Sequence, residues 1–192
     1  MIDIFIIINK GIKMVNDKWL IRWHEYLTDS YAHGSLIRFN ADQTIYYKNL
    51  LMPPGTVIHE WRSKTNHQAD RVEPSLPLID GESAYGITTN IRYLDDDETA
   101  GLMLRIIFYG RYDEVAGSII VREPNAIFKP PITTYSYSIQ LINGGATEFI
   151  FESLVLREVS REEYDEDQER IKQIKEDSKK GKKKRRRDKK SE

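Results

Sequence analysis

The feature that most limits the fold of this chain is a succession of short apolar and aromatic segments separated by turn residues. Several of them alternate between apolar and polar side chains, most clearly at residues 135–141, a period of two that is typical of a half-buried strand. No convincing helical pattern separates them. The predicted strands cover residues 18–23, 35–39, 44–47, 56–61, 84–93, 102–109, 118–121, 135–141 and 149–156.

This pattern predicts an all-β protein, an antiparallel β-sandwich. The first two strands after residue 30 are expected to form a hairpin that turns at Asn40, Ala41 and Asp42. A turn at residues 143–146, which contains two glycines, joins the last two strands and favours a jelly roll.

The least generic stretch runs from Leu51 to Leu78. Residues 53–55, Pro-Pro-Gly, predict a turn, because proline fixes φ and glycine accepts conformations that other residues resist. In the extended segment that follows, His59 and Trp61 share a face, with Glu60 on the other. We expect the Trp61 ring to be largely buried against the polar loop at residues 66–71.

That loop is crowded with hydrogen-bonding side chains, which can order it as a docking surface. Together with the preceding strand it forms our candidate site for a partner protein or a glycan. Its predicted members are His59, Trp61, Asn66, His67, Asp70 and Arg71.

Aromatic side chains on the predicted strands offer a second route to recognition, since exposed rings can stack on sugars or on a partner protein. We expect about two-thirds of them to lie in the core instead. They are Trp19, Trp23, Tyr46, Tyr47, Trp61, Tyr135 and Tyr137.

The length of 192 residues indicates one domain with extensions. We predict a poorly defined N-terminal extension at 1–17, the sandwich at 18–159, a charged helix at 160–177 and a disordered basic tail at 178–192. The apolar residues 4–8 are too short for a signal peptide, and nothing approaches a membrane span. Residues 4–8 either form an edge strand or precede the true translation start at Met14. We favour the second interpretation.

Charge is divided unevenly along the chain. Residues 178–192 contain ten Lys or Arg and two acidic residues, a net +8, so the first 177 residues carry −9 of the total −1. The tail could bind anionic lipid, RNA or an acidic protein surface, or remain solvated. It has no interleaved aromatic residue, so we expect no nucleic-acid partner. The residues expected to contact lipid or an acidic partner are Lys182, Lys183, Lys184, Arg185, Arg186 and Arg187.

Catalytic and metal-binding patterns are weak. The absence of cysteine excludes disulfides and thiolate metal sites, and the spacing of His59 and His67 with Glu60 or Asp70 matches no zinc signature. No Gly-x-Ser-x-Gly motif is present, and residues 33–35, His-Gly-Ser, lack a placed orienting acid. We therefore predict no catalytic residue, no metal and no cofactor.

Two stretches nevertheless resemble a known family. Residues 52–61 with 66–71, and independently residues 136–143, resemble the third of the accessory secretory proteins of the bacterial accessory Sec system, over roughly residues 18–158. The resemblance implies a jelly-roll sandwich similar to carbohydrate-binding modules. It also implies assembly with two sibling accessory proteins.

With an accessory SecA-type motor ATPase, such an assembly would support export and glycan modification of serine-rich-repeat glycoprotein adhesins. We expect the chain to lie in the cytoplasm. The basic tail, which is not part of the matching pattern, predicts peripheral association at the inner face of the membrane. The implied role is not catalytic. A stand-alone carbohydrate-binding module and an esterase or transferase are the alternatives.

Overall fold

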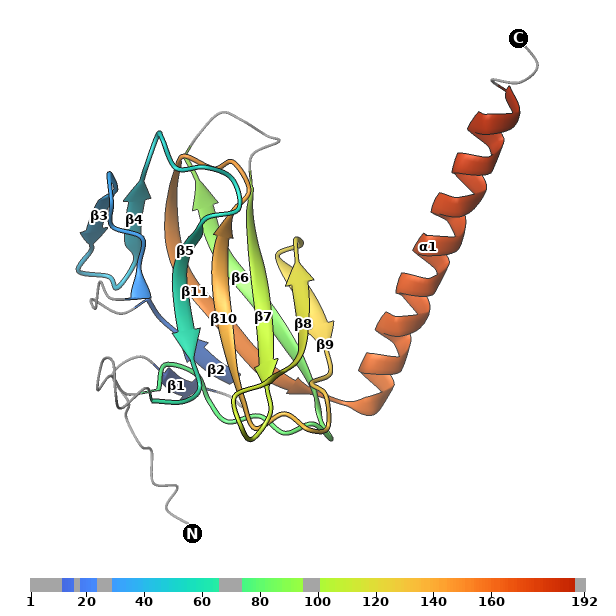
Figure 1. Cartoon of the computed structure of the whole chain (residues 1–192), viewed down its shortest axis with the longest axis horizontal. Coiled ribbons are helices and arrows are strands. Elements are labelled where there is room, and N and C mark those ends of the chain that lie inside the picture. The colour runs from blue at the N-terminus through green and yellow to red at the C-terminus, as the bar shows by residue number, and fades with distance from the viewer. Residues whose placement is uncertain (1–11, 16–17, 24–28, 66–73, 95–100, 189–192) are drawn as a thin grey trace. The chain divides into compact units, whose positions relative to one another are not determined.

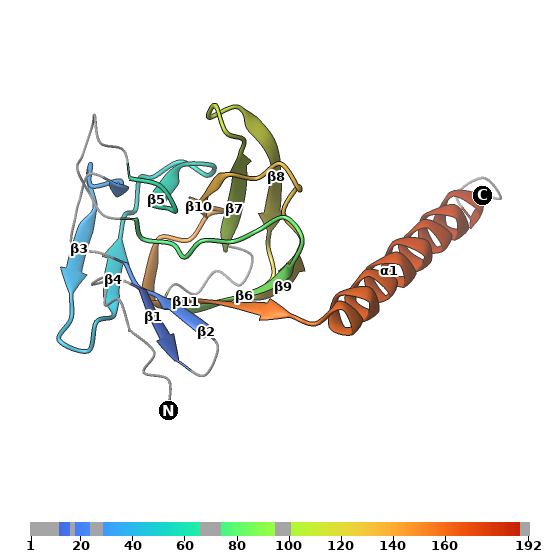
Figure 2. The ribbon, with the colours of Figure 1, turned by 90° about the horizontal axis from the view of Figure 1, so that it is seen from below.

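The computed structural model describes residues 12–15, 18–23, 29–65, 74–94 and 101–188. The chain divides into two compact units, Met1–Glu158 and Val159–Glu192, and each is described by itself. The first unit contains two β-sheets, which Figures 1 and 2 show as two facing layers. The prediction of an all-β sandwich is therefore confirmed.

The larger sheet has seven strands, organised around the long β11. β4 pairs with the first part of β11 at residues 148–151, and β2 pairs with its later part at residues 154–157. β1 extends the sheet from β2, β3 from β4, and β9 from β6, which also pairs with β11. These strands are β1 (Ile12–Val15), β2 (Lys18–Ile21), β3 (Leu36–Phe39), β4 (Ile45–Lys48), β6 (Ala84–Tyr93), β9 (Asn125–Phe128) and β11 (Glu148–Val159).

The smaller sheet has four antiparallel strands in the order β5-β10-β7-β8. They are β5 (Val57–Arg62), β7 (Leu102–Tyr109), β8 (Val115–Val121) and β10 (Ser136–Asn143). The outer edge of β5 is covered by irregular chain, because Tyr31 N donates to Ile58 O at 2.7 Å and Ser75 N donates to Arg62 O at 2.8 Å. This cover removes one site for uncontrolled strand pairing.

The core between the sheets follows the alternation of the strands. In β7 every second residue is buried, and β10 and β11 supply Ile139, Leu141, Phe149 and Phe151 from opposite layers. Trp23 joins the layers, with its ring 5.6 Å from Phe151 and 6.3 Å from Trp61 in edge contacts. Trp61 itself is fully buried, and its Nε1 donates to Arg22 O at 2.9 Å.

Both turns expected around prolines or glycines are present. Thr56 N donates to Pro53 O at 3.3 Å, and Gly55 has a φ of +89°, as expected for a turn with proline and then glycine at its centre. The Gly144–Gly145 turn carries the chain from β10 in one sheet to β11 in the other. The last two strands are therefore joined across the layers and do not form a hairpin.

The hairpin of β3 and β4 is confirmed, but two strands were not predicted. β1 lies within the expected extension at 1–17 and includes Met14, and it is ordered by antiparallel pairing with β2. β9 has only four residues between Pro124 and Pro130, too few to show alternation. The apolar residues 4–8 lie outside the described residues.

The second unit is the helix α1 (Arg161–Asp188). It begins at the N-cap residue Ser160, whose Oγ accepts from Glu163 N at 3.2 Å. Hydrogen bonds from its own backbone and from Ser160 lower the pKa of the Glu162 carboxyl. No helix in the described part of the chain is long and apolar enough to cross a membrane.

The predicted boundary of the helix at residue 177 needs correction. α1 continues to Asp188, through most of the tail predicted to be disordered. Lysine and arginine are good helix formers, and basic residues near a helix C-terminus interact favourably with its dipole. The basic tail is therefore the last part of the helix, as far as the described residues extend.

We predict that Trp61→Ala lowers the free energy of unfolding by about 3–5 kcal/mol, because it empties a large volume at the centre of the core. Thermal and urea melts of the full chain measure the change. Tyr135→Ala is the matched control, since that aromatic ring is exposed. An unchanged melt of the Trp61 variant would contradict the packing described here.

Candidate functional site: a polar groove on the four-stranded sheet

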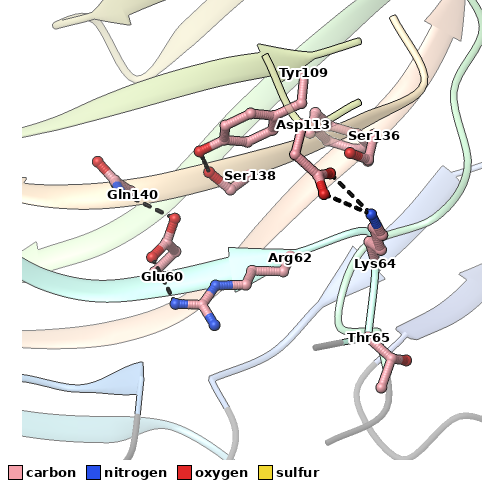
Figure 3. A pocket seen from close by; sticks show the side chains of 10 residues that line it. Glu60, Arg62, Lys64, Thr65, Tyr109, Asp113, Ser136, Ser138 and Gln140 are labelled. Atoms are coloured by element: carbon pink, nitrogen blue, oxygen red, sulfur yellow. Dashed lines mark hydrogen bonds and ion pairs between the residues drawn. The ribbon is translucent and has the colours of Figure 1, made fainter. Parts of the chain in front are cut away.

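A groove of about 600 Å³ lies on the outer face of the four-stranded sheet. Strand alternation places its side chains: Glu60 and Arg62 of β5 point away from buried Trp61, and Gln140 of β10 points away from buried Ile139. Figure 3 shows these side chains projecting into one space. The full lining comprises Glu60, Arg62, Lys64, Thr65, Tyr109, Asp113, Ser136, Tyr137, Ser138 and Gln140.

One half of the groove is a connected hydrogen-bond network. Gln140 Oε1 accepts from Arg105 Nε at 2.7 Å and also from Nη2 of the same guanidinium. Gln140 Nε2 donates to Glu60 Oε1 at 3.0 Å, and Glu60 Oε2 accepts from Arg62 at 3.0 Å. Arg62 also lies 3.5 Å from Asp29. The network fixes the positions of the groove's polar groups before any ligand binds.

The other half is formed where β5 and the β7–β8 turn approach each other. Lys64 Nζ lies 2.8 Å from Asp113 Oδ1 and 3.1 Å from Oδ2. Beside them, the hydroxyl of Tyr109 lies 3.5 Å from Ser138 Oγ. Exposed pairs of this kind contribute little to stability, so the Lys64–Asp113 pair is free to exchange partners with a ligand.

Tyr137 closes the groove from beneath and takes no part in proton chemistry near neutral pH. Its hydroxyl donates to Pro77 O at 2.8 Å, and burial raises the pKa of that hydroxyl well above its usual range. Among the described residues, no group of three or more His, Asp or Glu could hold a metal ion. The groove thus presents paired charges, one tyrosine and the side-chain amide of Gln140.

Two predicted site residues lie in the core. His59 is 2% exposed, and its ring stacks on Trp23 with centroids 4.5 Å apart. Its Nδ1 lies 2.7 Å from Ser30 Oγ, which accepts from Trp23 Nε1 at 3.0 Å. His59 and Trp61 therefore support β5 from the face opposite the groove.

The remaining predicted residues of this site, Asn66, His67, Asp70 and Arg71, lie outside the described residues. Their segment begins directly after Thr65, which lines the groove. The six basic residues at 182–187 lie in the last turns of α1.

Sequence reasoning missed most of the groove. Glu60 was placed on the correct face of its strand, and Gln140 lay in the family-like stretch 136–143 without being proposed as a site residue. Tyr109 and Asp113 stood in a strand and a turn with no distinguishing motif. The groove residues on the strands come together because Glu60 pairs with Gln140 and Tyr109 pairs with Ser136 on neighbouring strands. No local sequence pattern encodes this strand pairing.

Comparison with known proteins gives a family. Residues 30–158 match the family described as Accessory Sec secretory system ASP3. The chain is 34% identical over 133 residues to the accessory Sec system protein Asp3 of Streptococcus gordonii, covering 69% of this chain and 82% of the relative. A protein of the same name from Staphylococcus aureus is 26% identical over 149 residues, covering 77% of this chain and 45% of that protein.

Two solved structures share the fold. One is the Glycosylation Associate Protein (Gap123) complex of Streptococcus agalactiae, with a TM-score of 0.67 and 33% identity. The match covers 74% of this chain and 45% of the matched chain in that complex, so this chain spans less than half the length of the matched chain. The other is accessory secretory protein 1, 2 and 3 of Streptococcus pneumoniae, with a TM-score of 0.68, 24% identity and coverage of 78% and 100%.

Proposed function

The chain belongs to the Asp3 family of the accessory Sec system, and from this premise we propose that it is a non-catalytic subunit of an export complex. In this proposal it assembles with two sibling accessory secretory proteins. The observation that carries the proposal is the family match across residues 30–158, which covers most of the sandwich. The complexes named for the two similar structures support assembly as the shared property of such chains.

The groove supports a role in recognition. Its two carboxylates, on Glu60 and Asp113, each pair with a cation, so each charged pair offers a polar ligand both a donor and an acceptor. The substrate in this proposal is a serine-rich-repeat glycoprotein adhesin, delivered to an accessory SecA-type motor ATPase. The chain would act in the cytoplasm, at the inner face of the membrane during export.

Assembly is tested by co-expression of the tagged chain with the two sibling proteins of the same bacterium. We predict that all three elute together in size-exclusion chromatography, and that a tagged unrelated β-sandwich recovers neither sibling. Elution of the wild-type chain alone would contradict the proposed function.

We also propose that the docking surface includes Asn66, His67, Asp70 and Arg71. The Asp70→Ala variant should therefore recover less of the sibling proteins while its melting curve stays unchanged.

Glycan recognition by the groove is the second candidate, favoured by the Tyr109 side chain beside a fixed amide and paired charges. Aromatic edges and amides suit a polyhydroxylated, uncharged ligand. We predict that Tyr109→Ala weakens binding to a glycosylated adhesin fragment by about three- to tenfold. The matched control is Tyr112→Ala, which removes a ring that is 86% exposed and outside the lining.

The measurement is titration calorimetry with glycosylated and unglycosylated fragments. If the Tyr109 and Tyr112 variants bound the glycosylated fragment with equal affinity, the groove would not be the site of glycan recognition. Equal affinity of the wild-type chain for both fragments would assign binding to the polypeptide.

The basic end of α1 gives a third prediction, of loose attachment to an anionic membrane surface. Residues 178–192 carry a net +8, and each Lys or Arg close to anionic lipid contributes about 1 kcal/mol. We expect the full chain to sediment with anionic liposomes at low salt, less at physiological salt, and not with neutral liposomes. Equal sedimentation of the full chain and a chain lacking 178–192 would leave this segment as a solvated appendage.

A further inference from the structure

The loop between β4 and β5 exposes two adjacent leucines. Leu50 is 67% exposed and Leu51 is 91% exposed, whereas the next residue, Met52, is buried in the core. Single exposed leucines are common on protein surfaces, but this adjacent pair at the tip of an ordered loop forms an apolar projection that packs little against the described residues.

The first half of this loop is held by a buried amide. Asn49 is buried, and its Nδ2 donates to His33 O at 3.1 Å and to Ser35 Oγ at 2.9 Å. Its Oδ1 accepts from Leu51 N at 3.0 Å, so the backbone beneath the leucines is tied directly to the sandwich. The backbone N of Asn49 donates to Thr147 O at 2.9 Å.

The second half is held by another buried amide. Asn143 Nδ2 donates to Met52 O at 3.1 Å, and Asn143 O accepts from Gly55 N at 2.7 Å. The turn from Pro53 to Thr56 then returns the chain into β5. Both sides of the projection are therefore fixed, and little conformational freedom remains to be lost when the leucines become buried in a complex.

We propose that Leu50 and Leu51 form a preorganised apolar plug that inserts into a concave apolar socket on one of the sibling proteins. This inference rests on the proposed assembly and names the surface that would carry it. Burial of both side chains would supply the non-directional hydrophobic drive for docking, and the two buried asparagines would supply its geometry.

Charge favours a protein socket over a lipid surface. The first 177 residues carry a net −9, which opposes contact with an anionic bilayer everywhere except at the basic segment 178–192. The nearest charged side chain in the sequence, Lys48, is engaged by Glu148 at 2.7 Å. The plug therefore has no free cation beside it in β4 to anchor a lipid headgroup.

The test compares two variants of the chain. The double variant carries both Leu50→Ser and Leu51→Ser, and the control variant carries Leu78→Ser, which alters a leucine that is 81% exposed in another loop. Because all three side chains are exposed, each variant should melt within about 2 °C of the wild-type chain. Dissociation constants for the purified sibling pair are measured by biolayer interferometry. We expect the double variant to bind at least about tenfold more weakly and the Leu78 variant to match the wild-type chain.

The outcomes separate this inference from the proposed function. Wild-type binding with full retention in the double variant would overturn the plug and leave assembly standing. Equal weakening by Leu78→Ser would also overturn it, since the effect would not be localised. If the wild-type chain bound neither sibling protein, both the plug and the proposed assembly would be wrong. Loss of binding to anionic vesicles, with sibling affinity retained, would reassign the leucines to lipid and overturn the protein socket.

Discussion

The packing of aromatic rings between the two sheets is the interaction on which the rest of the molecule depends. Trp61 comes from the four-stranded sheet and Phe151 from the seven-stranded sheet, and their centroids lie 5.4 Å apart. Because side chains alternate along β5, the position of Trp61 in the core also sets the position of Glu60 on the surface. The shape of the groove is therefore inherited from the core beneath it, and a substitution in the aromatic cluster would be felt on the outer face.

Local sequence was sufficient for the elements with a clear period and insufficient for their arrangement. The alternation at residues 135–141 marks the core-facing side chains of β10 directly, and the proline and glycine of the β4–β5 turn constrain φ whatever their surroundings. By contrast, Glu60 and Gln140 meet only because β5 pairs with β10, and β9 is too short to have a period. His59 and Trp61 were placed on one face correctly, but the sequence could not tell which face the second sheet would cover.

The C-terminal segment shows a different limit. Its composition, rich in charge and nearly free of apolar residues, indicated disorder beyond residue 177, whereas helix propensity and the helix dipole favoured continuation to Asp188. The chain thus presents three surfaces of different chemistry: a polar groove with paired charges, an apolar loop and a cationic helix end. Ligands suited to one of these surfaces are poorly suited to the others, so under the proposed function each surface would take a partner of different chemistry.

Asn143 has a consequence for the order of events during synthesis. Its amide bonds to Met52 O across 91 positions of sequence, so the leucine loop acquires its second anchor only after β10 has left the ribosome and joined the sheet. A nascent or truncated chain that ends before this residue would carry both leucines but not the geometry that presents them. In the proposed docking, such premature chains would therefore compete poorly for the sibling protein that binds the finished chain.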